Sequence, residues 1–313
     1  MTTPPTARKD NSQEPFERFM FAMLEGYHDE GLREGLLLSA YAARVLAKYP
    51  KPALESGHDA EAEALALVAR VDASDNGADP RLTLQWLLDA LVLWPDCAEA
   101  YMWAANLIEG REYGIVLMQP FYVLSIEALK RRLGEQGPLS PDGAPRDVPE
   151  VTKLVKSLTG LGEALATQGK SDEATAHYIE ALRYDPADRI DTRPRLALAL
   201  ACLGDIDSAE ATVTTAHDNA YGLFARAVVA YCRTEGTGRA KQALLDARKS
   251  NPYVTAIITG QRRMLGMLTG DLRFDEGQQA CLMLAPALNG IPGLIEWIRR
   301  EAAPVSKGGK RKR

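Results

Sequence analysis

Two histidines stand directly before acidic residues, a combination of side chains that can transfer protons or bind a metal ion. His28 lies in GYHDEG and His58 lies in SGHDAE. A neutral imidazole serves as a general base or metal ligand, and acids from another helix could complete such a site. The HxxxH and HExxH spacings of helical metal sites do not occur in the sequence. We therefore expect both histidines to be surface residues, and a His/acid enzyme site near the N-terminal helices is the least favoured function.

Other motifs of catalysis and cofactor binding are also missing from the sequence. It contains no GxGxxG, no GxxxxGK[ST] and no GxSxG pattern. The glycine-containing stretch GTGRAK, at 236–241, is better explained as a turn that enters a helix than as a phosphate-binding loop. The sequence therefore predicts a protein that is not an enzyme and that uses no metal and no cofactor.

Basic residues are concentrated in the last nine residues, VSKGGKRKR, which hold no acidic residue. Lys310, Arg311, Lys312 and Arg313 are candidates for contact with nucleic acid, anionic lipid or an acidic protein. A disordered end that only increases solubility is the alternative interpretation. The whole chain has a formal net charge of −5, so its composition does not indicate a basic nucleic-acid-binding body.

The composition is typical of a globular protein, with 46% hydrophobic and 25% charged residues among 313. The four cysteines form no CxxC pair, which favours small core residues in a reducing compartment. No apolar run is long enough to cross a membrane, and the first residues hold no hydrophobic signal-peptide core. We expect a cytoplasmic protein that does not insert into a membrane.

Apolar residues recur at helical spacing along most of the chain, between stretches rich in Gly, Pro and Asn, and no alternating strand pattern is found. The sequence therefore predicts an all-α fold. The segment GEQGPLSPDGAPRDVPE, with four prolines and three glycines, is the best candidate boundary. We predict the following parts: a disordered lead (1–15), an N-terminal helical region with a partial repeat (16–133), a linker or long loop (134–150), repeats (151–260), C-terminal capping helices (261–301) and a disordered basic tail (302–313).

A spaced pattern of small residues recurs in the second half of the chain. In GKSDEATAHYIEALRYDP, at 169–186, the residues Ala174, Tyr178, Ala181 and Pro186 have offsets of 4, 7 and 12. The same offsets recur in two further segments: Ala209, Val213, Ala216 and Tyr221, and Ala240, Leu244, Ala247 and Pro252. Alanines let two helices approach closely, and Pro186 and Pro252 end the second helices of their pairs, whereas Tyr221 replaces the proline in the middle segment. One such pair cannot bury its own apolar face, so neighbouring pairs must stack.

This pattern resembles the tetratricopeptide repeat, a 34-residue helix–turn–helix unit. The resemblance implies a helical-hairpin solenoid with a flexible N-terminus and a basic C-terminal tail. Four segments further resemble the suppressor-of-tumorigenicity family and its uncharacterised bacterial relatives: LWPDCAEAYMWAANL (93–107), NPYVTAIITG (251–260), FDEGQQA (274–280) and IPGLIEWI (291–298). Thr255 replaces a proline that is usual in those relatives, and residues 134–150 do not match. The resemblance implies a helical scaffold and no reaction.

In such solenoids the first helices of the pairs form a concave face. The resemblance places Lys156, Arg195 and Arg226 on this face, where cationic groups suit carboxylates. Ordinary solvated charge is the alternative interpretation of these three residues. Thr159 and Glu163 stand where chaperone-binding members of the superfamily need Lys and Asn, so we do not expect binding of a chaperone tail.

Taken together, these patterns predict a non-enzymatic scaffold that binds a protein or peptide, of acidic character, in its concave groove. The second function considered is a nucleic-acid-associated regulator, which would use the basic tail while the repeats recruit a partner.

Overall fold

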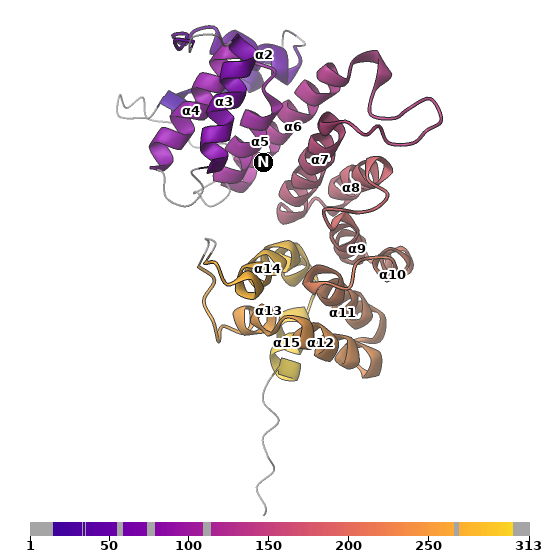
Figure 1. Cartoon of the computed structure of the whole chain (residues 1–313). Helices are drawn as coiled ribbons and strands as arrows, with labels where there is room; N and C mark the ends of the chain where they lie inside the picture. The colour runs from indigo at the N-terminus through magenta and orange to yellow at the C-terminus, as the bar shows by residue number, and fades with distance from the viewer. Residues whose placement is uncertain are drawn as a thin grey trace, which may run out of the picture. The chain divides into compact units, whose positions relative to one another are not determined.

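The computed structural model describes residues 15–32, 34, 36–54, 59–73, 79–108, 114–265 and 269–302. Within these ranges the chain is all-α, as the sequence predicted (Figure 1). The one β-type pairing among the described residues is an isolated bridge between Leu139 and Pro145. No helix in the described ranges is both long and apolar enough to span a membrane.

The chain divides into two compact units. Unit 1 comprises residues 1–109 and 120–134, and unit 2 comprises residues 110–119 and 135–313. The described elements of unit 1 are α1 (Pro15–Gly26), the π-helical turn η1 (Tyr27–Gly31), α2 (Leu38–Leu46), α3 (Ala60–Ala73), α4 (Pro80–Leu93), α5 (Ala98–Ile108) and the part of α6 (Gly114–Leu133) that follows Gln119.

Aromatic side chains fill the core of unit 1. The ring centroid of Phe16 lies 6.0 Å from that of Phe19 and 5.9 Å from that of Phe121. Tyr101 adds a fourth ring, 6.4 Å from Phe121. All four side chains are almost fully buried, and such ring pairs add to the stability that their buried area provides. These contacts hold α1, α5 and α6 together.

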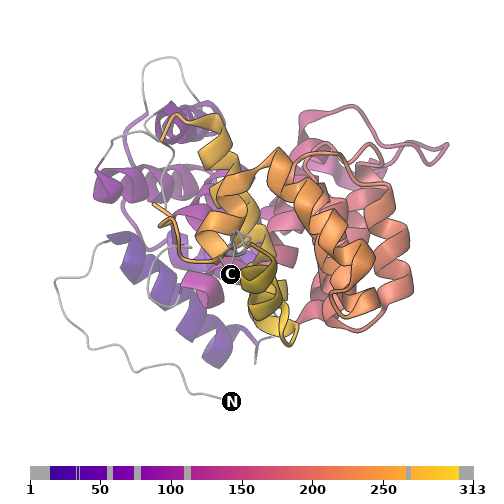
Figure 2. The same cartoon turned by 90° about the horizontal axis from the view of Figure 1, so that it is seen from below.

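Unit 2 begins with three helical hairpins that stack in chain order (Figures 1 and 2). They are α7 (Pro149–Thr167) with α8 (Ser171–Tyr184), α9 (Thr192–Cys202) with α10 (Ile206–Thr214), and α11 (Ala220–Thr234) with α12 (Gly238–Ser250). Each hairpin packs against the next, because α8 contacts α9 and α10 contacts α11. The first helices also meet directly, α9 lying against both α7 and α11.

Small residues make this stacking possible. Ala174 and Ala181 are completely buried on α8, and Tyr178 between them packs its ring on Gly162 of α7. The turns within the first two hairpins contain Gly169 at φ 78° and Gly204 at φ 80°. This left-handed backbone conformation ends a helix and strains residues that have a Cβ atom. The alanine spacing and the turn glycines therefore serve the close packing of the paired helices.

Of the predicted linker or loop at 134–150, residues 134–148 form a loop with internal hydrogen bonds, and the last two belong to α7. The short 3₁₀ turn η2 (Gly134–Gln136) is followed by the bridge between Leu139 and Pro145. The loop is closed by Arg146, whose backbone N–H donates to the carbonyl of Pro138 at 3.0 Å and whose guanidinium donates to that of Gly137 at 2.8 Å. Helix α7 then begins at Pro149, a favoured residue for the first turn of a helix.

Three helices follow the hairpins: α13 (Pro252–Ile258), α14 (Leu272–Gly290) and α15 (Leu294–Ala302). Helix α15 lies against α13, and its Trp297 donates from Nε1 to the carbonyl of Gly236, in the turn between α11 and α12, at 3.0 Å. The sequence predicted that residues 261–301 cap the last repeat. In the structure α15 covers this end, while α14 packs against α13 and also against α7, α9 and α11.

Candidate functional site

The three cations that the sequence singled out lie on the first helices α7, α9 and α11, whose predicted concave side is called here the first-helix face. Lys156 lies on α7 and is exposed to solvent. Among the described residues, no ion pair or side-chain hydrogen bond involves its ammonium group. Lys156 therefore offers its full positive charge to a ligand in solution.

Arg195 of α9 is bound by its own chain instead. Its Nε donates to Oε1 of Glu163 on α7 at 2.5 Å, and its Nη1 donates to the carbonyls of Ile190 and Asp191 at 3.0 and 2.7 Å. The guanidinium carbon lies 5.9 Å from the ring centroid of Tyr221 on α11. Only 17% of the side chain is exposed. Arg195 therefore links the three first helices to one another.

Arg226 of α11 binds backbone carbonyls at the end of α10 and in the segment that joins α10 to α11. It donates to the carbonyls of Val213 and Ala216 and forms an ion pair with Asp218. The Asp218 side chain is 83% exposed, so this ion pair lies at the surface. The structure thus places the three cations on successive first helices, with Lys156 unpaired, Arg195 internally bound and Arg226 paired to a surface carboxylate.

Helix α14 covers much of the first-helix face. The tetratricopeptide resemblance also assigns Thr159 of α7, Leu198 of α9, and Ala225 and Val229 of α11 to the open groove, and all four are buried. Three of these side chains are apolar, and an uncovered face of this kind would expose them to water. The buried face of α14 completes this core with Ala280, Cys281, Met283, Leu284 and Ala287.

The covered groove is a departure from the sequence-based expectation of an open face. Its signal was present in the sequence, because Leu198, Ala225 and Val229 stand at positions expected to face solvent. Hydrophobic residues at such positions indicate that another element covers them. Lys156 remains exposed, and the side chains of Glu163 and Arg226 are 38% and 26% exposed.

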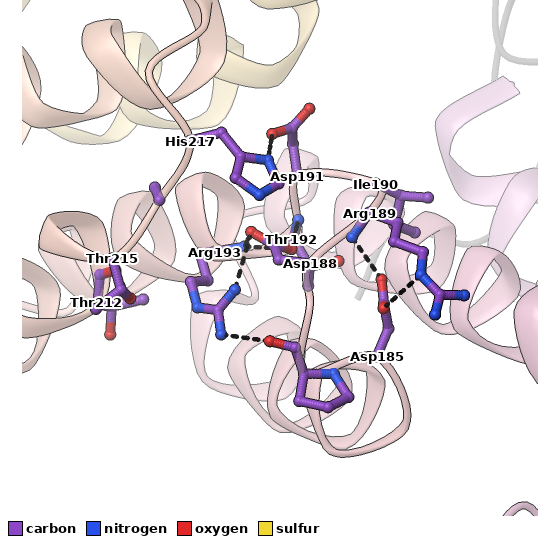
Figure 3. Close-up of polar contacts among 12 residues, drawn as sticks. Asp185, Asp188, Arg189, Ile190, Asp191, Thr192, Arg193, Thr212, Thr215 and His217 are labelled. Atoms are coloured by element: carbon purple, nitrogen blue, oxygen red, sulfur yellow. Dashed lines mark hydrogen bonds and ion pairs between the residues drawn. The ribbon is translucent and has the colours of Figure 1, made fainter. Parts of the chain in front are cut away.

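A second group of polar residues surrounds the loop between α8 and α9 (Figure 3). Asp188 is completely buried there, and its Oδ1 accepts from the backbone N–H of Thr192 at 2.5 Å and of Arg193 at 3.2 Å. Its carboxylate thus satisfies the first free N–H groups of α9, as a helix cap does. Burial raises the pKa of Asp188, against the opposing effect of these N–H donors.

Asp188, Asp191 and His217 bring ligand atoms of the metal-binding type within 4.8 Å of one another. Asp191 Oδ1 already lies 3.2 Å from His217 Nδ1 and accepts from Asn219 Nδ2 at 2.9 Å. The Arg193 guanidinium lies 3.6 Å from the Asp188 carboxylate, where its charge opposes a cation. Because the acceptor oxygens serve a helix terminus and a contact between two loops, the arrangement fits a structural role. The sequence showed no signal for this group.

Comparison with known proteins provides no family for this chain. No protein-family model matches it, and no curated protein matches it. The functional argument therefore rests on the chemistry of the described residues.

The remaining candidates from the sequence are placed as follows. His28 lies in η1 and is exposed, as are Asp29 and Glu30 beside it. His58 lies outside the described residues, as does the predicted anion-binding tail, Lys310, Arg311, Lys312 and Arg313. Contact of the tail with nucleic acid stays a prediction.

Proposed function

We propose that the protein is a non-enzymatic scaffold of the tetratricopeptide type, whose unit 2 binds an acidic protein or peptide. The observation that carries this proposal is the exposed Lys156 on α7, which no described residue binds, together with Arg226 on α11 and its surface partner Asp218. Stacked helical hairpins are an architecture that presents extended binding surfaces. A carboxylate-bearing segment along α7 to α11 would meet both cations.

The three cations have different roles in this proposal. Lys156 attracts the ligand as a free charge, in a chain whose formal net charge is −5. Arg226 becomes available when a ligand carboxylate replaces Asp218, because an exposed ion pair contributes only about 0–1 kcal/mol. Arg195 keeps α7 and α9 in place through Glu163 and is not itself the ligand contact.

Two substitutions with opposite expected effects test the proposal. A partner is first captured by affinity pull-down from the native host, and its dissociation constant is then measured for the wild type and the variants. Lys156→Glu should weaken binding at least ~10-fold, equivalent to ~1.4 kcal/mol. Asp218→Asn should strengthen it, because the variant removes the carboxylate that competes for Arg226. Equal affinity of the wild type and both variants would show that the partner binds elsewhere.

Lys249→Glu is the matched control. Lys249 lies in the last turn of α12 and is 74% exposed, and its ion pair with Asp246 is local. The Lys249→Glu variant changes the net charge by the same amount as Lys156→Glu, but the substituted residue lies on the second helix of a hairpin. Its affinity for the partner should equal that of the wild type. An equal loss in both variants would mean that overall charge, and not the first-helix face, governs binding.

A further inference from the structure

Unit 1 contains a cavity of about 470 Å³ between α1, α2 and α4. This size is within the range of pockets that hold small organic ligands. Its apolar lining comes from Ala22, Val45, Leu88 and Val92. The rings of Tyr41 and Tyr49 add aromatic surface. The cavity can therefore take up an apolar or aromatic group.

Three charged side chains line the same cavity: Arg18 of α1, Lys48 just after α2, and Asp89 of α4. None of them forms an ion pair with another described residue. Elsewhere in unit 1, buried or half-exposed arginines do pair with acids. Arg131 lies 2.5 Å from Asp96, and similar pairing joins Arg132 with Glu99 at 3.0 Å. No described residue therefore neutralises the three charges at the cavity.

The carboxylate of Asp89 is half-buried and only partly satisfied. Its Oδ1 accepts from Nε2 of Gln85 at 2.7 Å, while no described residue donates to Oδ2. Burial raises the pKa of this carboxyl, which reflects the cost of keeping its charge away from water. A positively charged group bound at Oδ2 would offset that cost.

Arg18 and Lys48 are the two cationic side chains among the residues that line the cavity. Arg18 and Tyr49 both line the cavity, and the charge of Arg18 opposes the effect of burial, which raises the pKa of Tyr49. A guanidinium binds a carboxylate through two parallel N–H donors, and an ammonium group adds a point charge. The cavity therefore offers a site for an anion, a site for a cation and an apolar lining.

We propose that this cavity binds a free amino acid with a large apolar or aromatic side chain. The ligand carboxylate would bind Arg18 and Lys48, and its ammonium group would bind Oδ2 of Asp89. Its side chain would lie on Val45, Leu88 and the tyrosine rings. This site lies in unit 1 and is independent of the proposed protein-binding face of unit 2.

Isothermal titration calorimetry on the full chain tests the ligand class, with L-phenylalanine, L-leucine and L-tryptophan as probes. At least one of the three should bind with a measurable dissociation constant. N-acetyl-L-phenylalanine lacks the ammonium group, L-phenylalaninamide lacks the carboxylate, and glycine lacks the side chain. Each should bind at least ~10-fold more weakly than L-phenylalanine, or than whichever of the three probes binds. Absence of heat for all three amino acids up to ~5 mM would overturn the proposal, since that leaves less than ~3 kcal/mol of affinity.

Two variants test the assigned contacts. Asp89→Asn keeps an oxygen that can accept from Gln85 but removes the charge, and Arg18→Gln removes the guanidinium. Each should weaken amino-acid binding at least ~10-fold. The controls are Asp72→Asn on α3 and Arg239→Gln on α12, both exposed and away from the cavity lining. The controls should bind as the wild type does, and unchanged affinity in Asp89→Asn would refute the ammonium contact. Circular dichroism melting of each variant separates a loss of affinity from a loss of folding.

Discussion

Gly162 and Tyr178 are in such close contact that a Cβ atom at Gly162 would lie 2.4 Å from Cε1 of the tyrosine ring. The ring is buried between α7 and α8. Two carbon atoms cannot lie 2.4 Å apart without bonding, so an alanine at this position would force the ring or the helix to move. Gly162→Ala should therefore destabilise the protein by about 1–3 kcal/mol, the usual cost of overpacking. Thermal or urea denaturation followed by circular dichroism measures the change.

A double-mutant cycle identifies the cause of that loss. In a Tyr178→Val background the ring that opposes the new methyl group is absent. Gly162→Ala should then be close to neutral, because the two residues are coupled through direct contact. If the alanine costs the same in both backgrounds, the ring is not what requires glycine at this position.

Ala181 on α8 should tolerate no larger side chain, since it is completely buried at the contact between paired helices. Ala181→Leu adds volume to a packed site and should cost about 1–3 kcal/mol of unfolding free energy. Ala176 lies on the same helix and is exposed, so Ala176→Leu provides a matched control that should change stability by less than about 0.5 kcal/mol. Equal melting temperatures of the two variants would contradict the packing argument.

Trp297 should be the main anchor of α15. Its ring lies 4.9 Å from that of Tyr231, is almost fully buried, and donates a hydrogen bond to Gly236. Trp297→Ala should cost about 3–5 kcal/mol. Trp297→Phe keeps most of the apolar contact but loses the hydrogen bond, so about 1–3 kcal/mol is expected because the Gly236 carbonyl is left unpaired. Arg299→Ala, an exposed change on the same helix, serves as the control in denaturant titration.

Asp275 should make the stability of unit 2 depend on pH in the acid range. Burial acts to raise the pKa of this carboxyl, but hydrogen bonds from Thr269 and Gly270 outweigh it, so the pKa falls below the usual value of 3.8. A lowered pKa in the folded state gives stability that is present above pH 3.8 and is lost as the pH falls through the folded-state pKa.

Urea denaturation across the pH range from ~2 to ~7 measures this contribution. The wild type should lose stability on acidification below 3.8, and Asp275→Asn should be less stable at neutral pH and should lose less on acidification. Asp72→Asn, at an exposed position, should retain the pH dependence of the wild type. A steep acid loss in Asp275→Asn equal to that of the wild type would assign the effect to other carboxylates.

The sequence alone determined the features that depend on local contacts. Helical periodicity predicted the all-α fold, and the register of Ala174, Tyr178 and Ala181 predicted the buried side of α8. The glycines at the turns within the first two hairpins, Gly169 and Gly204, are likewise local features, because each adopts a positive φ between two paired helices. These features follow from residue spacing over one or two helices, because a helix places residues three and four apart on the same face.

Only the tertiary structure determined which residues and helices pack against the faces of these helices. Nothing in the spacing of Arg195 indicated that Glu163, 32 residues earlier, would bind its guanidinium. The cover that α14 provides for the first-helix face depends on the path of the chain after α13. The cavity between α1, α2 and α4 likewise joins Arg18 and Asp89 from helices far apart in the sequence. Such long-range contacts arise when separate apolar faces are buried together. They depend on the packing of the whole chain and do not follow from the periodicity of one segment.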